Sequence, residues 1–221
     1  MKRRLVIGLL LAGSLGAFLM GQRSEQPGDP PREIPEPPDA PRPDLVVSPE
    51  GLEAFVPYRG RRFSVPFTFD YPRNWVAGEE EGRSEPYQQI VILGPRNAQD
   101  TYSAGLTIRI LPTRAAGGSY ADLSELAQWR RSQHAQTKDA VILKEQMAHV
   151  GGLSGTELEV ESHAALPPRA LEQHRTTLRT HLVMLAKGDR LYEFSYSADA
   201  HDYPRYHSAF DRLLRSLRFT P

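Results

Sequence analysis

Three glutamates alternate along one short stretch of the chain, at Glu157, Glu159 and Glu161. Successive side chains of a β-strand point to opposite faces, so this spacing places three carboxylates on one face, with Leu158 and Val160 on the other. Such a row could supply the acid and base of a hydrolase, form a polar binding surface, or pair with cations on a neighbouring strand.

Two further residues share a face of the next predicted strand, Arg179 and His181, and Glu193 lies on the strand after that. Opposite charges across strands stabilise a sheet by about 0.2–1 kcal/mol per pair, which accounts for this pattern without catalysis. Nothing in the sequence raises the pKa of one carboxyl selectively, as a glycosidase requires. The candidate binding surface consists of Glu157, Glu159, Glu161, Arg179, His181 and Glu193.

Sequence motifs for other kinds of chemistry are missing. The chain has seven histidines and no cysteine, which excludes thiol catalysis and Cys-based zinc sites, and no histidines follow the HExxH pattern. His201 and His207 are nearly two helical turns apart, too far for a chelating pair on one regular helix. The glycines of Gly152-Leu153-Ser154-Gly155 are too close for a GxSxG nucleophile motif. We therefore expect no catalytic residue, metal site or cofactor.

Strands and two helices must position the polar residues. Turn signals at Gly151-Gly152 and Gly188-Asp189 predict antiparallel hairpins, whereas the acidic stretch from Gly78 to Gly82 predicts a solvated loop. A helix follows a cap at Ser119 or Asp122. The predicted strands cover residues 62–71, 88–93, 104–111, 140–150, 153–162, 176–187 and 190–197.

A second helix is predicted to begin at Asp202, just before Tyr203-Pro204. Its apolar residues recur at near-helical intervals and form a wide stripe, so this helix must cover a sheet. The stripe contains Tyr203, Tyr206, Phe210, Leu213, Leu214 and Leu217. Helices covering a mostly antiparallel sheet make an α+β domain.

Two stretches carry a family resemblance: the aromatic run from Phe69 to Trp75, and the strand from Leu191 to Ala198 that leads into the ending Phe210 to Phe219. Together with the order of elements between them, they resemble the PsbP-like family over most of residues 60–221. The resemblance implies an α/β/α sandwich and a non-enzymatic binding protein. Leu217 stands where the family often has phenylalanine, and no thylakoid-type transit peptide is present, so a place in the oxygen-evolving machinery is not expected.

The basic start MKRR followed by the uncharged residues 5–20 predicts export. Residues 1–21 act either as a cleaved signal peptide or as a retained N-terminal membrane anchor, and both alternatives place the rest of the chain outside the cytoplasm. Membrane contact is expected only through residues 1–21.

The rest of the chain divides into a tether and a domain. Residues 22–57 are rich in proline and charge, which predicts a disordered tether, and residues 58–221 predict one globular domain. Lysine plus arginine and aspartate plus glutamate both number 27, and this balance gives no reason to expect nucleic acid as a partner. Without cysteines the domain has no disulfide, and its core must hold it together.

Two functions are compatible with these features. The first is an exported, tethered, non-catalytic protein-binding or accessory module of the cell envelope, a monomer with an unknown envelope protein as its partner. The alternative is an extracytoplasmic small-ligand binder or hydrolase that uses the polar sheet face. A concave polar pocket favours the alternative, and a shallow surface with exposed apolar side chains favours the first.

Overall fold

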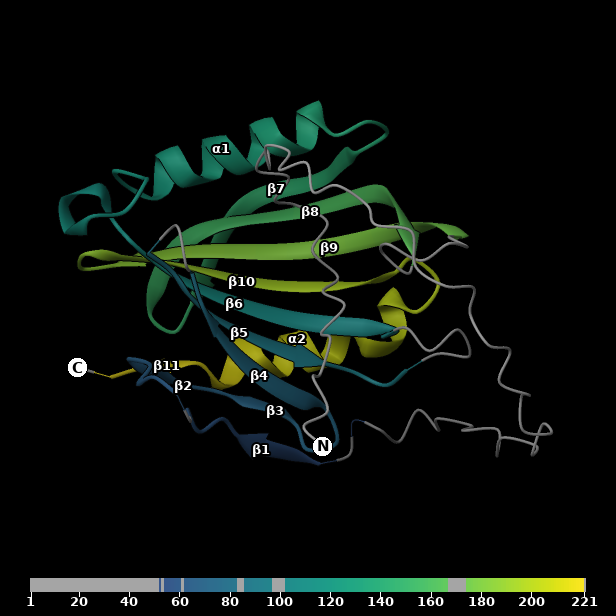
Figure 1. Cartoon of the computed structure of the whole chain (residues 1–221), viewed down its shortest axis with the longest axis horizontal. Helices are drawn as coiled ribbons and strands as arrows, with labels where there is room; N and C mark the ends of the chain where they lie inside the picture. Colours follow the sequence, from purple (N-terminus) through teal and green to yellow (C-terminus); the bar gives the residue numbers. More distant parts are fainter. Residues whose placement is uncertain are drawn as a thin grey trace, which may run out of the picture.

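The computed structural model describes residues 52, 54–60, 62–82, 86–96, 102–166 and 174–220 (Figure 1). The predicted export segment and nearly all of the predicted tether lie outside these residues. Within them, no helix is both long enough and apolar enough to cross a membrane.

A seven-stranded sheet forms the centre of the domain, and all of its neighbouring strands are antiparallel. Its strand order is β4-β5-β6-β10-β9-β8-β7. The predicted tight turns are confirmed, since Gly151, Gly152 and Gly188 all have positive φ. The strands are β4 (Val76–Glu81), β5 (Gln88–Leu93), β6 (Ala104–Pro112), β7 (Val141–Val150), β8 (Leu153–Leu166), β9 (His174–Lys187) and β10 (Arg190–Asp199).

The two helices cover opposite faces of this sheet (Figure 1). On β9, Leu182 belongs to the apolar cluster under α1 (Leu123–Gln136), and its neighbour Val183 belongs to the cluster under α2 (Tyr203–Ser216). A short 3₁₀ helix, η2 (Arg114–Ala116), precedes α1. The α+β architecture of a mostly antiparallel sheet flanked by helices is therefore confirmed, with the layers in the order helix, sheet, helix.

Both helix starts follow the predicted cap residues. At α1 the cap is Asp122, whose Oδ1 accepts a hydrogen bond from the backbone N–H of Glu125 at 2.9 Å. At α2, Asp202 is the cap residue and proline occupies the first turn. The predicted apolar stripe of α2 is confirmed as a buried face, with Tyr203, Tyr206, Ala209, Phe210 and Leu213 inside the core.

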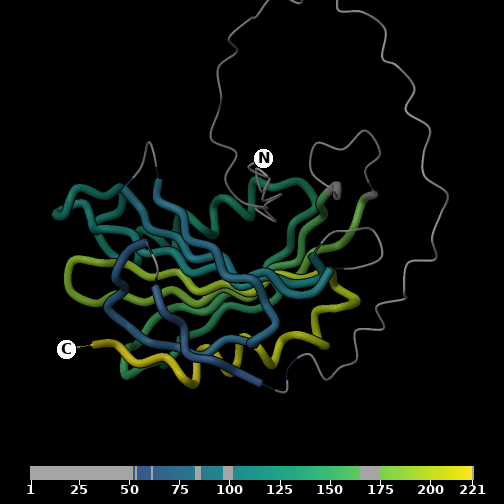
Figure 2. Tube along the Cα trace, turned by 60° about the horizontal axis from the view of Figure 1, so that its bottom comes forward, coloured from purple at the N-terminus to yellow at the C-terminus, as the bar shows by residue number. Residues whose placement is uncertain are grey.

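Four short strands lie on the α2 side of the sheet (Figures 1 and 2). β1 (Phe55–Pro57) pairs with β3 (Asp70–Pro72), and β2 (Phe67–Thr68) pairs with β11 (Arg218–Phe219). The prediction of one strand over residues 62–71 is therefore wrong, because β2 and β3 have different partners. β1 also begins before Tyr58, the predicted start of the domain.

The acidic stretch from Gly78 to Gly82 was expected to be a solvated loop, and that expectation is wrong. Its first four residues belong to the edge strand β4, where Gly78 pairs with Val91. Glu79 accepts a 2.6 Å hydrogen bond from the hydroxyl of Tyr58. Composition alone predicted a loop because it does not show where a strand lies in the sheet. An edge strand such as β4 leaves room for carboxylates, and Glu79 lies beside the hydroxyl of Tyr58.

Gly155 of β8 leaves no room for a side chain beside β9, and this leads to a testable expectation. A Cβ there would meet the carbonyl oxygen of Met184 at 2.1 Å and Leu185 Cδ2 at 2.6 Å. Gly155→Ala should lower the free energy of unfolding by about 1–3 kcal/mol, because the backbone of β9 must shift. Gly105 in β6 is the matched control, since an added Cβ there meets only ordinary contacts at 3.8 Å. Equal urea midpoints for the two alanine variants would contradict this account.

Candidate functional site

Five of the six predicted binding residues lie together on the α2 side of the sheet. We call Glu157, Glu159 and Glu161 of β8 with Arg179 and His181 of β9 the polar row. In the register, Glu159 pairs with His181 and Glu161 pairs with Arg179. The predicted alternation is confirmed, because Leu158 and Val160 are buried in the cluster under α1 on the other face.

Two carboxylates of the polar row, those of Glu157 and Glu159, have cationic or amide partners. Glu159 accepts a 2.6 Å hydrogen bond from Arg179. Glu157 Oε1 lies 3.2 Å from Lys144 Nζ, and Glu157 Oε2 accepts a 2.9 Å hydrogen bond from Gln146, both on β7. Burial alone would raise the pKa of each carboxyl group, but these hydrogen bonds outweigh it and lower both pKa values. Both glutamates are therefore ionised at neutral pH.

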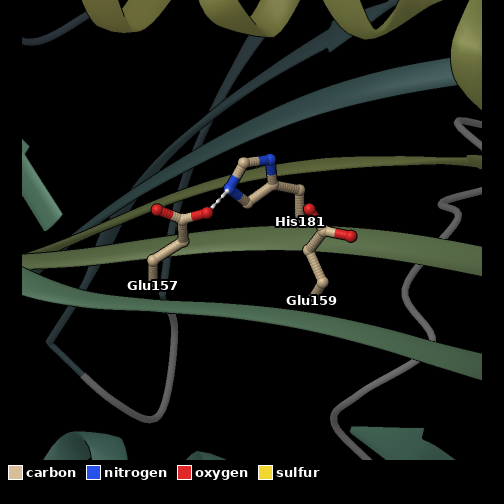
Figure 3. Close-up of side chains that lie close together, drawn as sticks. All are labelled: Glu157, Glu159 and His181. Atoms are coloured by element: carbon tan, nitrogen blue, oxygen red, sulfur yellow. Dashed lines mark ion pairs between the residues drawn. The ribbon is translucent and has the colours of Figure 1, made fainter. Parts of the chain in front are cut away.

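His181 is the buried member of the polar row, with 7 % of its surface exposed. Its Nε2 lies 3.0 Å from Glu157 Oε1, and Glu159 lies beside the same ring (Figure 3). That contact is close in distance but lacks the alignment of an N–H···O hydrogen bond, so Nε2 has no hydrogen-bond partner. Burial lowers the pKa of His181 more than the nearby glutamates raise it, which favours a neutral imidazole.

The other nitrogen of His181 contacts α2. His181 Nδ1 lies 2.9 Å from His207 Nε2, and His207 Nδ1 lies 3.4 Å from Asp211 Oδ2. The two imidazole planes differ by only 6° with ring centroids 5.2 Å apart, an arrangement that suits an N–H···N hydrogen bond in the plane of both rings. His207 was not predicted as a site residue, because its spacing along the chain was compared only with that of His201. The available signal was its position on α2 between the buried Tyr203 and Phe210.

Glu193 is not brought together with the polar row. It lies on the α1 side of β10, where its carboxylate forms a two-point contact with Arg130 of α1 and lies 3.7 Å from Arg109 of β6. Only 2 % of Glu193 and 9 % of Arg130 are exposed. The sheet separates this ion pair from the other five predicted residues, so it joins α1 to the sheet.

The edge strand β7 borders the polar row and exposes large apolar side chains. Val141 is 56 % exposed, Leu143 46 % and Met147 66 %. In the part of the chain that the structure describes, the sheet order ends at β7, so its outer edge pairs with no other strand. A bulge between Ile142 and Lys144 interrupts its pairing with β8, and the register is regular from Lys144 to Val150.

Comparison with known proteins gives similar folds but no family. No family model matches the chain, and no curated protein matches it. Similar solved structures include cyanobacterial PsbP from Synechocystis, at 13 % identity and TM-score 0.46 over 76 % of this chain and 94 % of that one. The yeast Ran-binding protein Mog1p is similar at 14 % identity and TM-score 0.47, over 75 % of this chain and 95 % of that one. LpqN of Mycobacterium tuberculosis, described as involved in cell envelope biogenesis, is similar at 15 % identity and TM-score 0.44, over 76 % of this chain and 91 % of that one. At these identities no partner, activity or site residue is transferred to this chain.

Proposed function

We propose that this protein is a non-catalytic accessory module of the cell envelope that binds an extended segment of a partner protein along β7. The observation that carries this proposal is the open edge of β7 together with its exposed apolar side chains. An unpaired edge offers a row of backbone N–H and C=O groups to an incoming strand. Exposed apolar side chains beside that row add contact area and select the partner.

The shape of β7 indicates which part of the edge is used. Natural proteins protect edge strands with bulges and charges, and the bulge after Ile142 does this for the first residues of β7. The regular part from Lys144 to Val150 is long enough for a paired segment, with Met147 near its centre. The expected partner segment is therefore extended and places an apolar side chain against Met147.

The polar row favours binding over catalysis. A glycosidase-type mechanism needs one carboxylic acid that stays protonated near neutral pH. The pKa values of Glu157 and Glu159 are both lowered, so neither fits the part of a general acid. The export segment and the proline-rich tether predicted from the sequence complete the proposal, because they would hold the domain outside the cytoplasmic membrane.

Site-specific photo-cross-linking in cells tests this proposal. A photoreactive amino acid at Met147 or at the exposed His149, both in the regular part of β7, should give a cross-linked product with one envelope protein. Val76 on β4, the opposite edge of the sheet, is 56 % exposed and is the matched control, from which no such product is expected. A product with the mass of two copies of this chain would assign the edge to self-association instead.

Charge substitution supplies the second arm of the experiment. Met147→Glu should reduce the cross-link from position 149 at least about tenfold, because burying an unpaired carboxylate against the partner is costly. Val76→Glu should leave it unchanged. The proposal fails if Met147→Glu and Val76→Glu give equal yields.

A further inference from the structure

We infer that Glu157, Glu159 and His181 form a binding site for one divalent transition-metal ion of the zinc type. One ligand atom of each side chain lies within 4.8 Å of the other two (Figure 3). The three residues come from two hydrogen-bonded strands, β8 and β9, so the backbone already fixes their separation. Spacing along the chain did not predict a metal site, because the ligands lie on separate strands.

The positions of the protons on His207 and His181 determine whether His181 Nε2 faces the glutamates with a proton or with a lone pair. When the carboxylate of Asp211, 3.4 Å away, favours a proton on Nδ1 of His207, His207 Nε2 carries a lone pair and accepts the Nδ1 proton of His181. A neutral His181 then directs the lone pair of Nε2 at Glu157 Oε1, 3.0 Å away. Two acceptors at this distance repel each other unless a cation lies between them.

The lack of a hydrogen bond at this nitrogen agrees with that arrangement. Nε2 is buried and close to a carboxylate, yet no N–H···O hydrogen bond forms. The hydroxyl of Tyr203 on α2 is likewise buried without a hydrogen-bond partner, and its ring lies under the guanidinium of Arg179. Burial, and then the charge of Glu159, raise the pKa of Tyr203, so it remains a neutral hydroxyl. Unsatisfied buried polar atoms beside two carboxylates mark a place where an ion or ligand is accommodated.

The ligand geometry fits zinc better than calcium. Ligand atoms at about 2.0–2.2 Å from a tetrahedral zinc ion lie roughly 3.3 Å from one another. His181 Nε2 and Glu157 Oε1 are already near this separation at 3.0 Å, and the Glu159 ligand atom, within 4.8 Å of both, needs only a side-chain rotation to approach them. An imidazole ligand favours transition metals, whereas calcium takes six to eight oxygen ligands. Three protein ligands leave the fourth position to water.

Neighbouring side chains supply the outer shell that metal sites require. Gln146 holds Glu157 Oε2 and so leaves Oε1 as the coordinating atom. Lys144, the cation now nearest Oε1, is partly exposed and can swing into water. His207, backed by Asp211, holds the ring of His181 as a second-shell partner does.

Calorimetric titration of the full chain with Zn²⁺, after dialysis against EDTA, tests the site. The unmodified chain should bind one Zn²⁺ ion. His207→Asn should weaken binding about 10–100-fold through loss of outer-shell support, and Glu157→Gln, Glu159→Gln and His181→Asn should weaken it further. Glu161→Gln, on the same face of β8, and His201→Asn, at an exposed histidine, are the controls that should bind like the unmodified chain.

A second measurement keeps the test independent of folding defects in the variants. The ¹⁵N shift of His181 Nε2 in the unmodified, metal-free protein should show a nitrogen without a proton, and that signal should move on addition of Zn²⁺. Two results would overturn the inference. One is a protonated Nε2 whose shift does not respond to Zn²⁺, and the other is Zn²⁺ binding that Glu157→Gln and Glu159→Gln leave unchanged.

Discussion

Replacing Glu193 with leucine should lower the free energy of unfolding by about 3–5 kcal/mol, because the guanidinium of Arg130 would then be charged, buried and unpaired. Burial alone would lower the pKa of Arg130, but the charge of Glu193 outweighs this effect and raises it, so the arginine stays charged. Arg109 also approaches Glu193, but Arg109 Nε keeps a 2.9 Å hydrogen bond to Gln89. Equilibrium urea unfolding measures the loss.

A double-mutant cycle separates the ion pair from its surroundings. Arg130→Met combined with Glu193→Leu should recover most of the stability, since apolar side chains of similar volume often replace a buried pair at little cost. Arg131 and Glu145 provide the exposed control, at 3.0 Å and with both side chains well exposed, where Glu145→Leu should cost about 0.2–1 kcal/mol. If the double variant lost as much free energy of unfolding as the two single variants lose together, the stabilising role assigned to the pairing would be refuted.

Phe210→Ala should lower the free energy of unfolding by about 3–5 kcal/mol, because it leaves a cavity where α2 meets the sheet. Phe210 is completely buried, with its ring 4.9 Å from that of His181 and 6.2 Å from that of Tyr196. Thermal or urea unfolding measures this loss.

The control for Phe210→Ala lies on the exposed side of the same helix. Arg215→Ala should change stability by no more than about 0.5 kcal/mol. Asp211 is unsuitable for this purpose because it contacts His207. If Phe210→Ala unfolded at the same temperature as the unmodified chain but no longer bound a partner, α2 would be a recognition helix and not the cover of the sheet.

Local patterns in the sequence were sufficient to predict the buried face of an element when that element's own residues determine it. Alternation along 153–162 predicted both faces of β8, and the stripe from Tyr203 to Leu213 predicted the buried side of α2. The glycine turns predicted the hairpins because a positive φ is a property of single residues.

Features set by a distant partner could not be predicted in this way. His181 and His207 meet through the docking of α2, which no spacing along the chain reveals. Glu193 carried a partial signal, since it lies between Tyr192 and Phe194, whose side chains belong to the core under α2. Its placement opposite the polar row follows only once the register of β9 and β10 is known.

The order of strands in the sheet also bears on how the chain folds. β7, β8, β9 and β10 are consecutive in sequence and pair as a meander, so each contact closes a short loop. β6 is different, because Ile108 pairs with Phe194 only after α1 and three strands have been made. We therefore expect the meander and the β4-β5-β6 unit to form as local nuclei, and the seam between β6 and β10 to be the slow, rate-setting closure.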